Sequence, residues 1–346
     1  MTLNLCPPEV CSQIFAIACT DGGYTGCALS AVSRYIHDTS SPYKFQSVAL
    51  HNTRQAVSFT SVLDRTLPRL RGVAFLFISN DDDVVAIDTP DDRPGSTGIS
   101  GRFRIPSMFS FTSPAKTRPT NDNDHNIVFV EAMLKILRFI APTLRTLFIS
   151  FECRWIKLPS FPSASGTVFP TLSSLTEFSL NYRAPTDALF NHYMHYFPLA
   201  LPSLRCLDIS RLKLLSYRGH LFRSIAKIAP SLTHLHLPAK MATNIINAPF
   251  ASPPIWPPVP EDGNIPVALH RMLIQLNGPH IYGCQNPDPG CTRCRLLAMT
   301  ADGRFVALEA HRDDTWKRNR ECLEHEWMDR ISGGEGGWDE TSAVDK

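Results

Sequence analysis

The chain has 346 residues, of which 43% are hydrophobic and 19% are charged, a composition typical of a globular protein with one large or two smaller domains. Its 34 basic and 32 acidic residues leave a net charge of +2, which argues against nucleic acid or an anionic membrane as the main partner. No apolar run approaches the roughly 18 residues that span a bilayer, and no basic segment of a signal peptide opens the chain.

Residues 1–45 are predicted to form a small helical domain. Pro7 and Pro8 suit the start of a helix, because the first turn does not use the N–H groups that proline lacks. Two apolar stripes then follow at helical spacing, the first at Val10, Ile14 and Ile17 and the second at Leu29, Val32 and Ile36. Two helices this short cannot bury their apolar faces alone, so they need each other and a third surface.

Residues 46–240 are predicted to repeat one strand–helix unit. Most units begin with Pro-Ser-Leu or Pro-Thr-Leu. Each unit contains three hydrophobic residues, with two other residues between the first and the second and one other residue between the second and the third. The middle hydrophobic residues fall at positions 48, 76, 147, 178, 207 and 235, and the last three intervals are 31, 29 and 28 residues. A near-constant period just under about 30 residues indicates stacked strand–helix units. Helices are expected at 127–140, 188–197 and 221–229.

The longer interval between positions 76 and 147 contains a polar insertion at 80–124, which we expect to be disordered. Residues 241–266 are rich in proline and are predicted to form a stiff linker. Residues 267–332 are expected to be a C-terminal helical region, with a helix at 302–330 whose mixed charges suggest a solvated face. Residues 333–346 are expected to be a flexible tail.

The ten Cys residues are expected to be reduced thiols of a cytoplasmic or nuclear protein. Four residues have a spacing that could provide a tetrahedral zinc site, His280, Cys284, Cys291 and Cys294. The alternative is unligated thiols beside a turn, because Cys284 has no neighbouring cysteine to form a second pair. A metal enzyme is disfavoured, since four protein ligands leave no open position for chemistry. No nucleophile elbow or phosphate loop is present, and neither an enzyme nor a bound cofactor is expected.

The opening residues resemble an F-box. The F-box pattern begins with Leu-Pro-x-Glu, followed by an aliphatic pair and then by Ile-Phe. After a gap it has a Leu, and then a Val that is followed by a spacer, a basic residue and an aromatic residue. The matching positions are Pro7-Pro8-Glu9-Val10, Ile14-Phe15, Leu29 and Val32-Ser33-Arg34-Tyr35. Cys6 and Cys11 stand where the family usually has Leu, and each removes apolar area worth on the order of 1 kcal/mol. Together with the repeats, the chain resembles fungal-type F-box proteins with degenerate leucine-rich repeats.

The resemblance implies an α/β protein in which an F-box helical hairpin precedes an irregular leucine-rich-repeat-like β/α solenoid. It implies a substrate receptor of an SCF-type cullin–RING ubiquitin ligase, in which the F-box binds the Skp-family adaptor and the solenoid holds a target protein. The implied adaptor contacts are Pro7, Pro8, Glu9, Val10, Ile14, Phe15, Leu29 and Val32. Two alternatives stay open: the hairpin only caps the first repeat, or the repeats form a protein-binding scaffold that uses no ligase.

Overall fold

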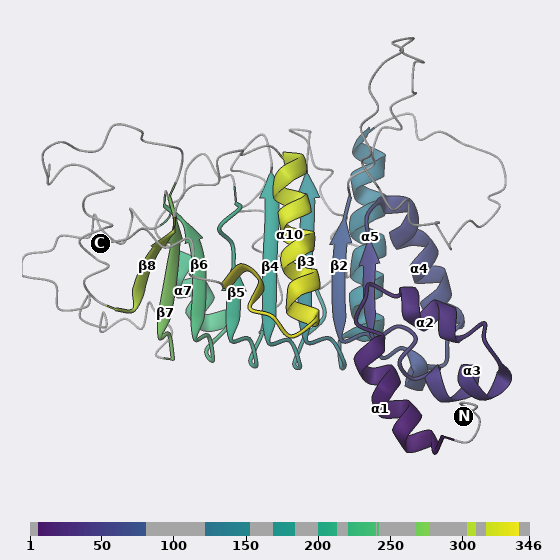
Figure 1. Ribbon diagram of the computed structural model, residues 1–346. Coiled ribbons are helices and arrows are strands. Elements are labelled where there is room, and N and C mark those ends of the chain that lie inside the picture. The colour runs from purple at the N-terminus through teal and green to yellow at the C-terminus, as the bar shows by residue number, and fades with distance from the viewer. Residues whose placement is uncertain are drawn as a thin grey trace, which may run out of the picture.

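The computed structural model describes residues 6–80, 122–152, 169–183, 200–212, 221–239, 241, 268–276, 303–308 and 316–338. These residues form a mixed α/β fold around one parallel eight-stranded sheet, in which the strands follow one another in chain order (Figure 1). The strands are β1 Ser47–Leu50, β2 Phe75–Ser79, β3 Thr146–Glu152, β4 Glu177–Arg183, β5 Cys206–Asp208, β6 His234–Pro238, β7 Arg271–Gln275 and β8 Phe305–Leu308.

The sheet register confirms the alignment predicted from the repeats. The six middle hydrophobic residues lie side by side across β1 to β6, as Val48, Leu76, Leu147, Phe178, Leu207 and Leu235, and the row continues through Met272 and Phe305. All eight side chains are buried in one hydrophobic core. Each unit therefore places its middle hydrophobic residue at the same point of the strand.

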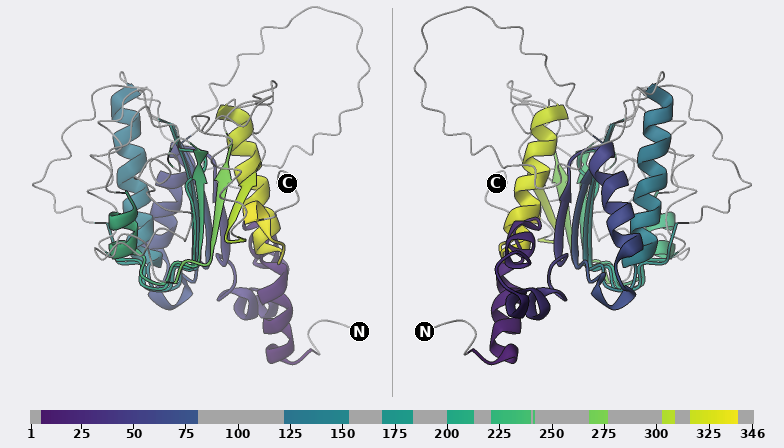
Figure 2. Two further views of the ribbon diagram at one scale, coloured as in Figure 1. Left: turned by 90° about the vertical axis from the view of Figure 1, so that its left-hand side faces the viewer. Right: turned by 90° about the vertical axis from the view of Figure 1, so that its right-hand side faces the viewer.

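Three helices cover the core face of the sheet, α4 Thr53–Arg65, α5 Asp122–Ile140 and α7 Leu221–Ile228 (Figure 2). The helices predicted at 127–140 and 221–229 are thus confirmed. The Asn52 side chain caps α4 by accepting a hydrogen bond from the Gln55 N–H at 2.9 Å, which satisfies one of the free donors of the first turn. The buried residues Ala56, Phe59 and Leu63 of α4 pack into the core. A 3-10 helix, η2 Pro68–Leu70, leads from α4 towards β2.

The turns that lead into the strands are joined by shared backbone hydrogen bonds. The Arg145 carbonyl accepts from the N–H groups of Thr176 at 2.8 Å and Glu177 at 3.1 Å, and the Arg205 carbonyl accepts in the same way from Thr233 and His234. A carbonyl oxygen has two lone pairs, so it can hold two donors from the next unit. These bonds fix the turns of neighbouring units in a row.

The other face of the sheet is covered by α10 Trp316–Ile331 and by the 3-10 helix η4 Gly336–Trp338 (Figure 2). Trp327 is fully buried there, in a cluster with Phe77, Phe148, Leu323 and Ile331. The helix predicted at 302–330 is therefore confirmed only in its C-terminal half. Its charged face is also not simply solvated, because several of its charges contact the sheet, as described below.

The prediction of a purely helical region at 267–332 is wrong for residues 271–275 and 305–308. These segments are β7 and β8, which extend the same sheet as the strands before them. The physical reason is that a short apolar run such as Met272-Leu273-Ile274 fits a buried strand as well as a buried helix turn.

The N-terminal helices are α1 Pro8–Ala18, α2 Tyr24–Leu29 and α3 Arg34–Ser40, which lie beside the β1 end of the sheet (Figure 1). The two-helix prediction is therefore wrong in its second half, since Leu29 and Ile36 belong to different helices. Ser33 is extended, with φ −160°, and its side chain accepts from the Ile36 N–H at 3.2 Å. A serine in this conformation starts a new helix rather than continuing the old one.

Several predictions fall outside the described residues: nearly all of the insertion at 80–124, the helix at 188–197, most of the linker at 241–266, the four candidate zinc ligands and the end of the tail. Among the helices that the structure does describe, none has the length and apolarity needed to cross a membrane.

Candidate functional site

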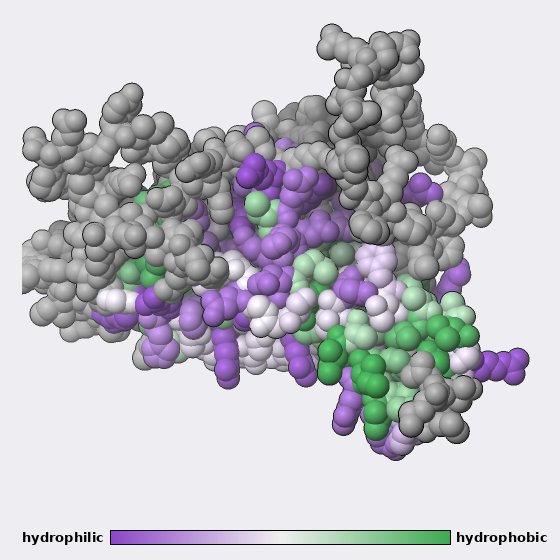
Figure 3. Space-filling view, in the orientation of Figure 1, coloured by the Kyte–Doolittle hydropathy of each residue, from purple (hydrophilic) through white to green (hydrophobic). Residues whose placement is uncertain are grey.

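An exposed apolar stripe runs along α1. Val10, Ile14 and Ile17 lie on one face of the helix, and the Ile17 side chain is 77% exposed. Tyr24 and Val32, from the following segments, are also exposed. The N-terminal helices accordingly form the largest hydrophobic area visible in Figure 3. We call these five residues the α1 surface.

The opposite face of α1 packs against α3. Cys11, Phe15 and Ile36 form a buried cluster, and Leu29 and Tyr35 pack against it. The Tyr35 hydroxyl donates to the Cys6 carbonyl at 2.6 Å, which fixes the start of α1 to α3. These contacts hold the three helices together.

The eight predicted adaptor contacts therefore divide into two groups. Six are exposed, Pro7, Pro8, Glu9, Val10, Ile14 and Val32. Phe15 is only 3% exposed and is covered by the other helices, whereas Leu29 is half-buried against the same cluster and keeps part of its surface exposed. Ile17 and Tyr24 are also exposed but were not among the predicted contacts, although Ile17 continues the spacing of Val10 and Ile14 by one helical turn.

The N-terminal helices are anchored to the sheet by hydrogen bonds at the start of β1. The Ser47 hydroxyl donates to the Cys19 carbonyl at 2.8 Å and accepts from the Gly22 N–H at 3.1 Å. The Gln46 amide donates to the Ala16 carbonyl at 2.7 Å. Gly22 has φ +78°, and a Cβ atom at this position would lie 3.8 Å from the Trp327 ring. The α1 surface is thus held in a fixed orientation relative to the sheet.

A buried cluster of charged residues links β5 and β6 to α10. Arg211 pairs with Asp208 at 3.1 Å and with Glu326 of α10, and His236 lies 3.3 Å from Asp208. Burial alone would raise the pKa of the Asp208 carboxyl, but His236, Arg211 and the Ser210 N–H outweigh it and lower that pKa. Burial raises the pKa of Glu326, against the opposing effect of Arg211. These charges are used to hold α10 on the sheet.

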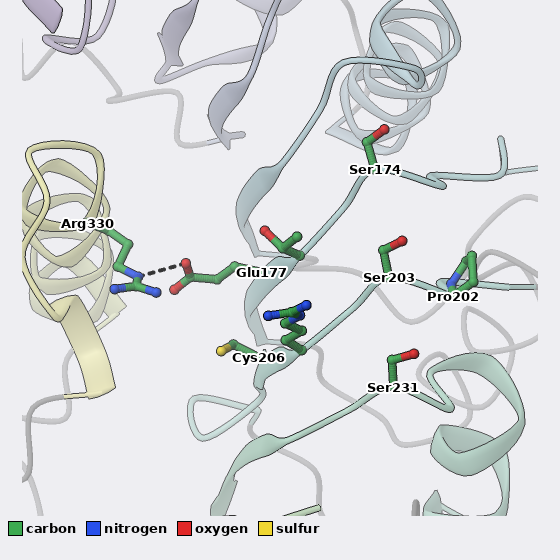
Figure 4. A pocket seen from close by; sticks show the side chains of 9 residues that line it. Ser174, Glu177, Pro202, Ser203, Cys206, Ser231 and Arg330 are labelled. Carbon is green, nitrogen blue, oxygen red and sulfur yellow. Dashed lines mark hydrogen bonds and ion pairs between the residues drawn. The ribbon is translucent and has the colours of Figure 1, made fainter. Parts of the chain in front are cut away.

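A polar cavity of about 580 Å³ opens at the beginning of β4, β5 and β6. It is lined by Ser174, Thr176, Glu177, Pro202, Ser203, Arg205, Cys206, Ser231 and Arg330. Figure 4 shows three serines in a row on successive turns, with Glu177 and Arg330 paired on the opposite side. Arg330 donates to Glu177 at 2.8 Å, and the Trp338 indole N–H donates to the same carboxylate at 2.9 Å.

The Cys206 thiol in the cavity is not activated for nucleophilic chemistry. Burial, and then the nearby Glu177 carboxylate, raise the pKa of Cys206 to about 11. At neutral pH this residue is therefore a thiol, and the thiolate is the nucleophilic form of cysteine.

Within the described ranges, no group of three or more His, Cys, Asp or Glu side chains is arranged to hold a metal ion. Comparison of the chain with protein-family models, with curated proteins and with solved structures gives no match. The features of the molecule that bear on its function are therefore the α1 surface, the charge cluster and the cavity.

Proposed function

We propose that this protein is a substrate-receptor subunit of an SCF-type cullin–RING ubiquitin ligase. In this proposal the N-terminal helices bind the Skp-family adaptor, the strand–helix units hold a target protein, and the ligase chemistry belongs to other subunits. The observation that carries the proposal is the exposed stripe of Val10, Ile14 and Ile17 on a helix with F-box-like residues.

The spacing of the stripe supports helix docking. Residues separated by four and three positions lie on one face of a helix, which is the arrangement by which an amphipathic helix fills an apolar groove. Removing an aliphatic side chain from water contributes on the order of 1 kcal/mol when it is already half covered. Three such side chains on one helix face offer an area of favourable contact, and Tyr24 and Val32 add exposed apolar area on the following segments.

The buried position of Cys11 bears on the departures from the F-box pattern. Cys11 is fully buried against Phe15 and Ile36, so its small size affects the packing of the three helices and not the area offered to a partner. This observation favours an F-box that still binds its adaptor over an F-box that has lost its contact surface.

The sheet supports the proposed leucine-rich-repeat-like architecture for the rest of the chain. Parallel strands in chain order, with one hydrophobic position in register across all eight, are what stacked repeats require. Such an array presents a long surface whose exposed side chains can vary without disturbing the core, which suits target binding.

The test is co-expression of the full chain with a Skp-family adaptor, followed by size-exclusion chromatography. We expect a one-to-one complex that is lost when Ile14→Asp and Ile17→Asp are combined. Val57→Asp is the matched control, because Val57 is an exposed aliphatic residue on a different helix, α4, and this variant should still bind. If the double variant bound the adaptor as well as the wild type, the proposal would fail. A folded wild-type chain that elutes alone would favour the ligase-independent scaffold.

A further inference from the structure

The row of serines in the cavity follows from the repeat. Ser174, Ser203 and Ser231 each stand four residues before a core residue, and these core residues, Phe178, Leu207 and Leu235, are paired across the sheet. Neighbouring strands are about 4.8 Å apart, so the three hydroxyl groups line one wall of the cavity at similar intervals (Figure 4).

Two of these hydroxyl groups are available to a ligand. The Ser174 hydroxyl donates to the Pro142 carbonyl at 2.8 Å, and the neighbouring Thr176 hydroxyl donates to the Arg145 carbonyl at 3.1 Å. Ser203 and Ser231 make no side-chain hydrogen bond within the part of the chain that the structure describes. Their O–H groups can therefore donate to an acceptor in the cavity.

The charged residues that line the cavity carry a net positive charge. Arg330 is paired with Glu177 through Nε and donates through Nη1 to the Gly334 carbonyl at 2.9 Å. Arg205 is exposed and forms no ion pair among the described residues. Because Cys206 stays neutral, the balance of Arg205, Arg330 and Glu177 gives the lining a net charge of +1.

We propose that this cavity binds a phosphoryl group. Guanidinium and hydroxyl donors are the groups that proteins commonly use for phosphate, and here they converge from two walls: Ser203, Ser231 and Arg205 from the turns, and Arg330 from α10. A tetrahedral oxyanion presents acceptor oxygens in several directions and fits such donors, whereas a planar carboxylate uses fewer of them. Glu177 is held by Arg330 and Trp338, which limits its repulsion of the anion.

This inference adds a ligand class to the proposed receptor function, but the site does not depend on adaptor binding. The phosphoryl group belongs either to a phosphorylated residue of a bound protein or to a free phosphate compound. Both sources share the same chemistry at the cavity, and the experiment separates them.

The experiment is a calorimetric titration of the full chain, or of its adaptor complex, with inorganic phosphate at constant ionic strength. We expect saturable binding that Arg205→Gln weakens by at least about tenfold, since a charged donor is lost. Arg145→Gln is the matched control: Arg145 is also exposed and occupies the same place before β3, but it lies outside the cavity. Adaptor binding by both variants should be unchanged, so failure here is distinct from failure of the receptor proposal.

A second titration uses a phosphoserine peptide and its unphosphorylated form. Tighter binding of the phosphopeptide than of inorganic phosphate assigns the group to a protein, and equal binding assigns it to a free anion. Absence of phosphate binding to the wild type, or an equal loss in the Arg205 and Arg145 variants, overturns the proposal.

Discussion

Arg211 and Glu326 form a buried ion pair across 115 positions of sequence. Arg211 follows β5 and Glu326 lies in the middle of α10. One helical turn later, Arg330 pairs with Glu177 of β4 in the opposite sense. The two pairs can form together only when α10 has one orientation and one register on the sheet, because reversal or sliding of the helix would place like charges together.

Replacement of Arg211 by Gln should therefore destabilise the protein severely. The change leaves the carboxylates of Asp208 and Glu326 buried without their shared cation, and we expect a loss of about 3–5 kcal/mol in the free energy of unfolding. Urea denaturation measures this loss. Arg183→Gln is the control, since Arg183 is half exposed and 3.8 Å from Glu152, and it should cost less than about 1 kcal/mol. Equal effects of the two substitutions would contradict the account.

Alkylation of Cys206 should be slow at pH 8 for an electrostatic reason. A pKa of about 11 in place of 9.0 lowers the thiolate fraction about a hundredfold at any pH well below both values. Since this side chain is partly exposed, access alone does not prevent reaction. Site-resolved mass spectrometry after iodoacetamide treatment should show a reaction rate that rises with pH up to about 11, and labelling of the same residue in the urea-unfolded chain gives the reference rate. Equal rates in the two states would refute the raised pKa.

Ile14 and Phe15 are adjacent in sequence, but replacement by Ala should destabilise the protein at Phe15 and leave it nearly unchanged at Ile14. Phe15 is buried with Cys11 and Ile36, so its loss leaves a cavity and should cost about 3–5 kcal/mol in the stability of the N-terminal helices. Ile14 is about half exposed, and its loss should change stability by no more than about 0.5 kcal/mol. Hydrogen exchange of α1 and α3 measures both effects. Equal exchange in the two variants would show that the helices pack differently.

Gly26 should not tolerate even a methyl group. A Cβ atom at this position of α2 would lie 2.3 Å from the Lys44 carbonyl oxygen, which belongs to the backbone and cannot rotate away. Gly26→Ala should therefore destabilise the N-terminal helices by more than about 1 kcal/mol. Gly303→Ala provides the comparison, because a Cβ at Gly303 meets nothing within 4 Å. Thermal unfolding that is unchanged in both variants would argue against the close approach of α2 to Lys44.

The sequence was sufficient to predict the positions that share a sheet register, because every unit must bury its middle hydrophobic residue at the same level of the core. Val48 through Leu235 follow this rule at near-constant spacing. The pattern did not predict the last two strands, β7 and β8. Met272 and Phe305 follow the middle hydrophobic residue of the preceding strand at longer intervals, and no Pro-Ser-Leu or Pro-Thr-Leu turn stands before them.

The exposed surface was harder to predict than the core. Helical spacing groups Val10 with Ile14 but does not tell which side of α1 meets α3, so Phe15 was assigned to the partner although it is buried. The charges of α10 were similarly ambiguous. Mixed charge along a helix usually indicates solvent. The partners of Glu326 and Arg330 are Arg211, which follows β5, and Glu177 of β4, both more than a hundred positions earlier, where no local pattern points to them.

The closeness of Trp327 to Gly22 has a consequence for synthesis. A ribosome makes the N-terminal helices long before Trp327, which lies close to their turn at Gly22. Until α10 leaves the exit tunnel, Phe77 and Phe148 have no Trp327 to cover them, and the helices lack one of their supports. Chains that end before α10 would therefore expose aromatic rings that the folded protein buries. Chaperones and proteases could recognise such chains by these exposed rings.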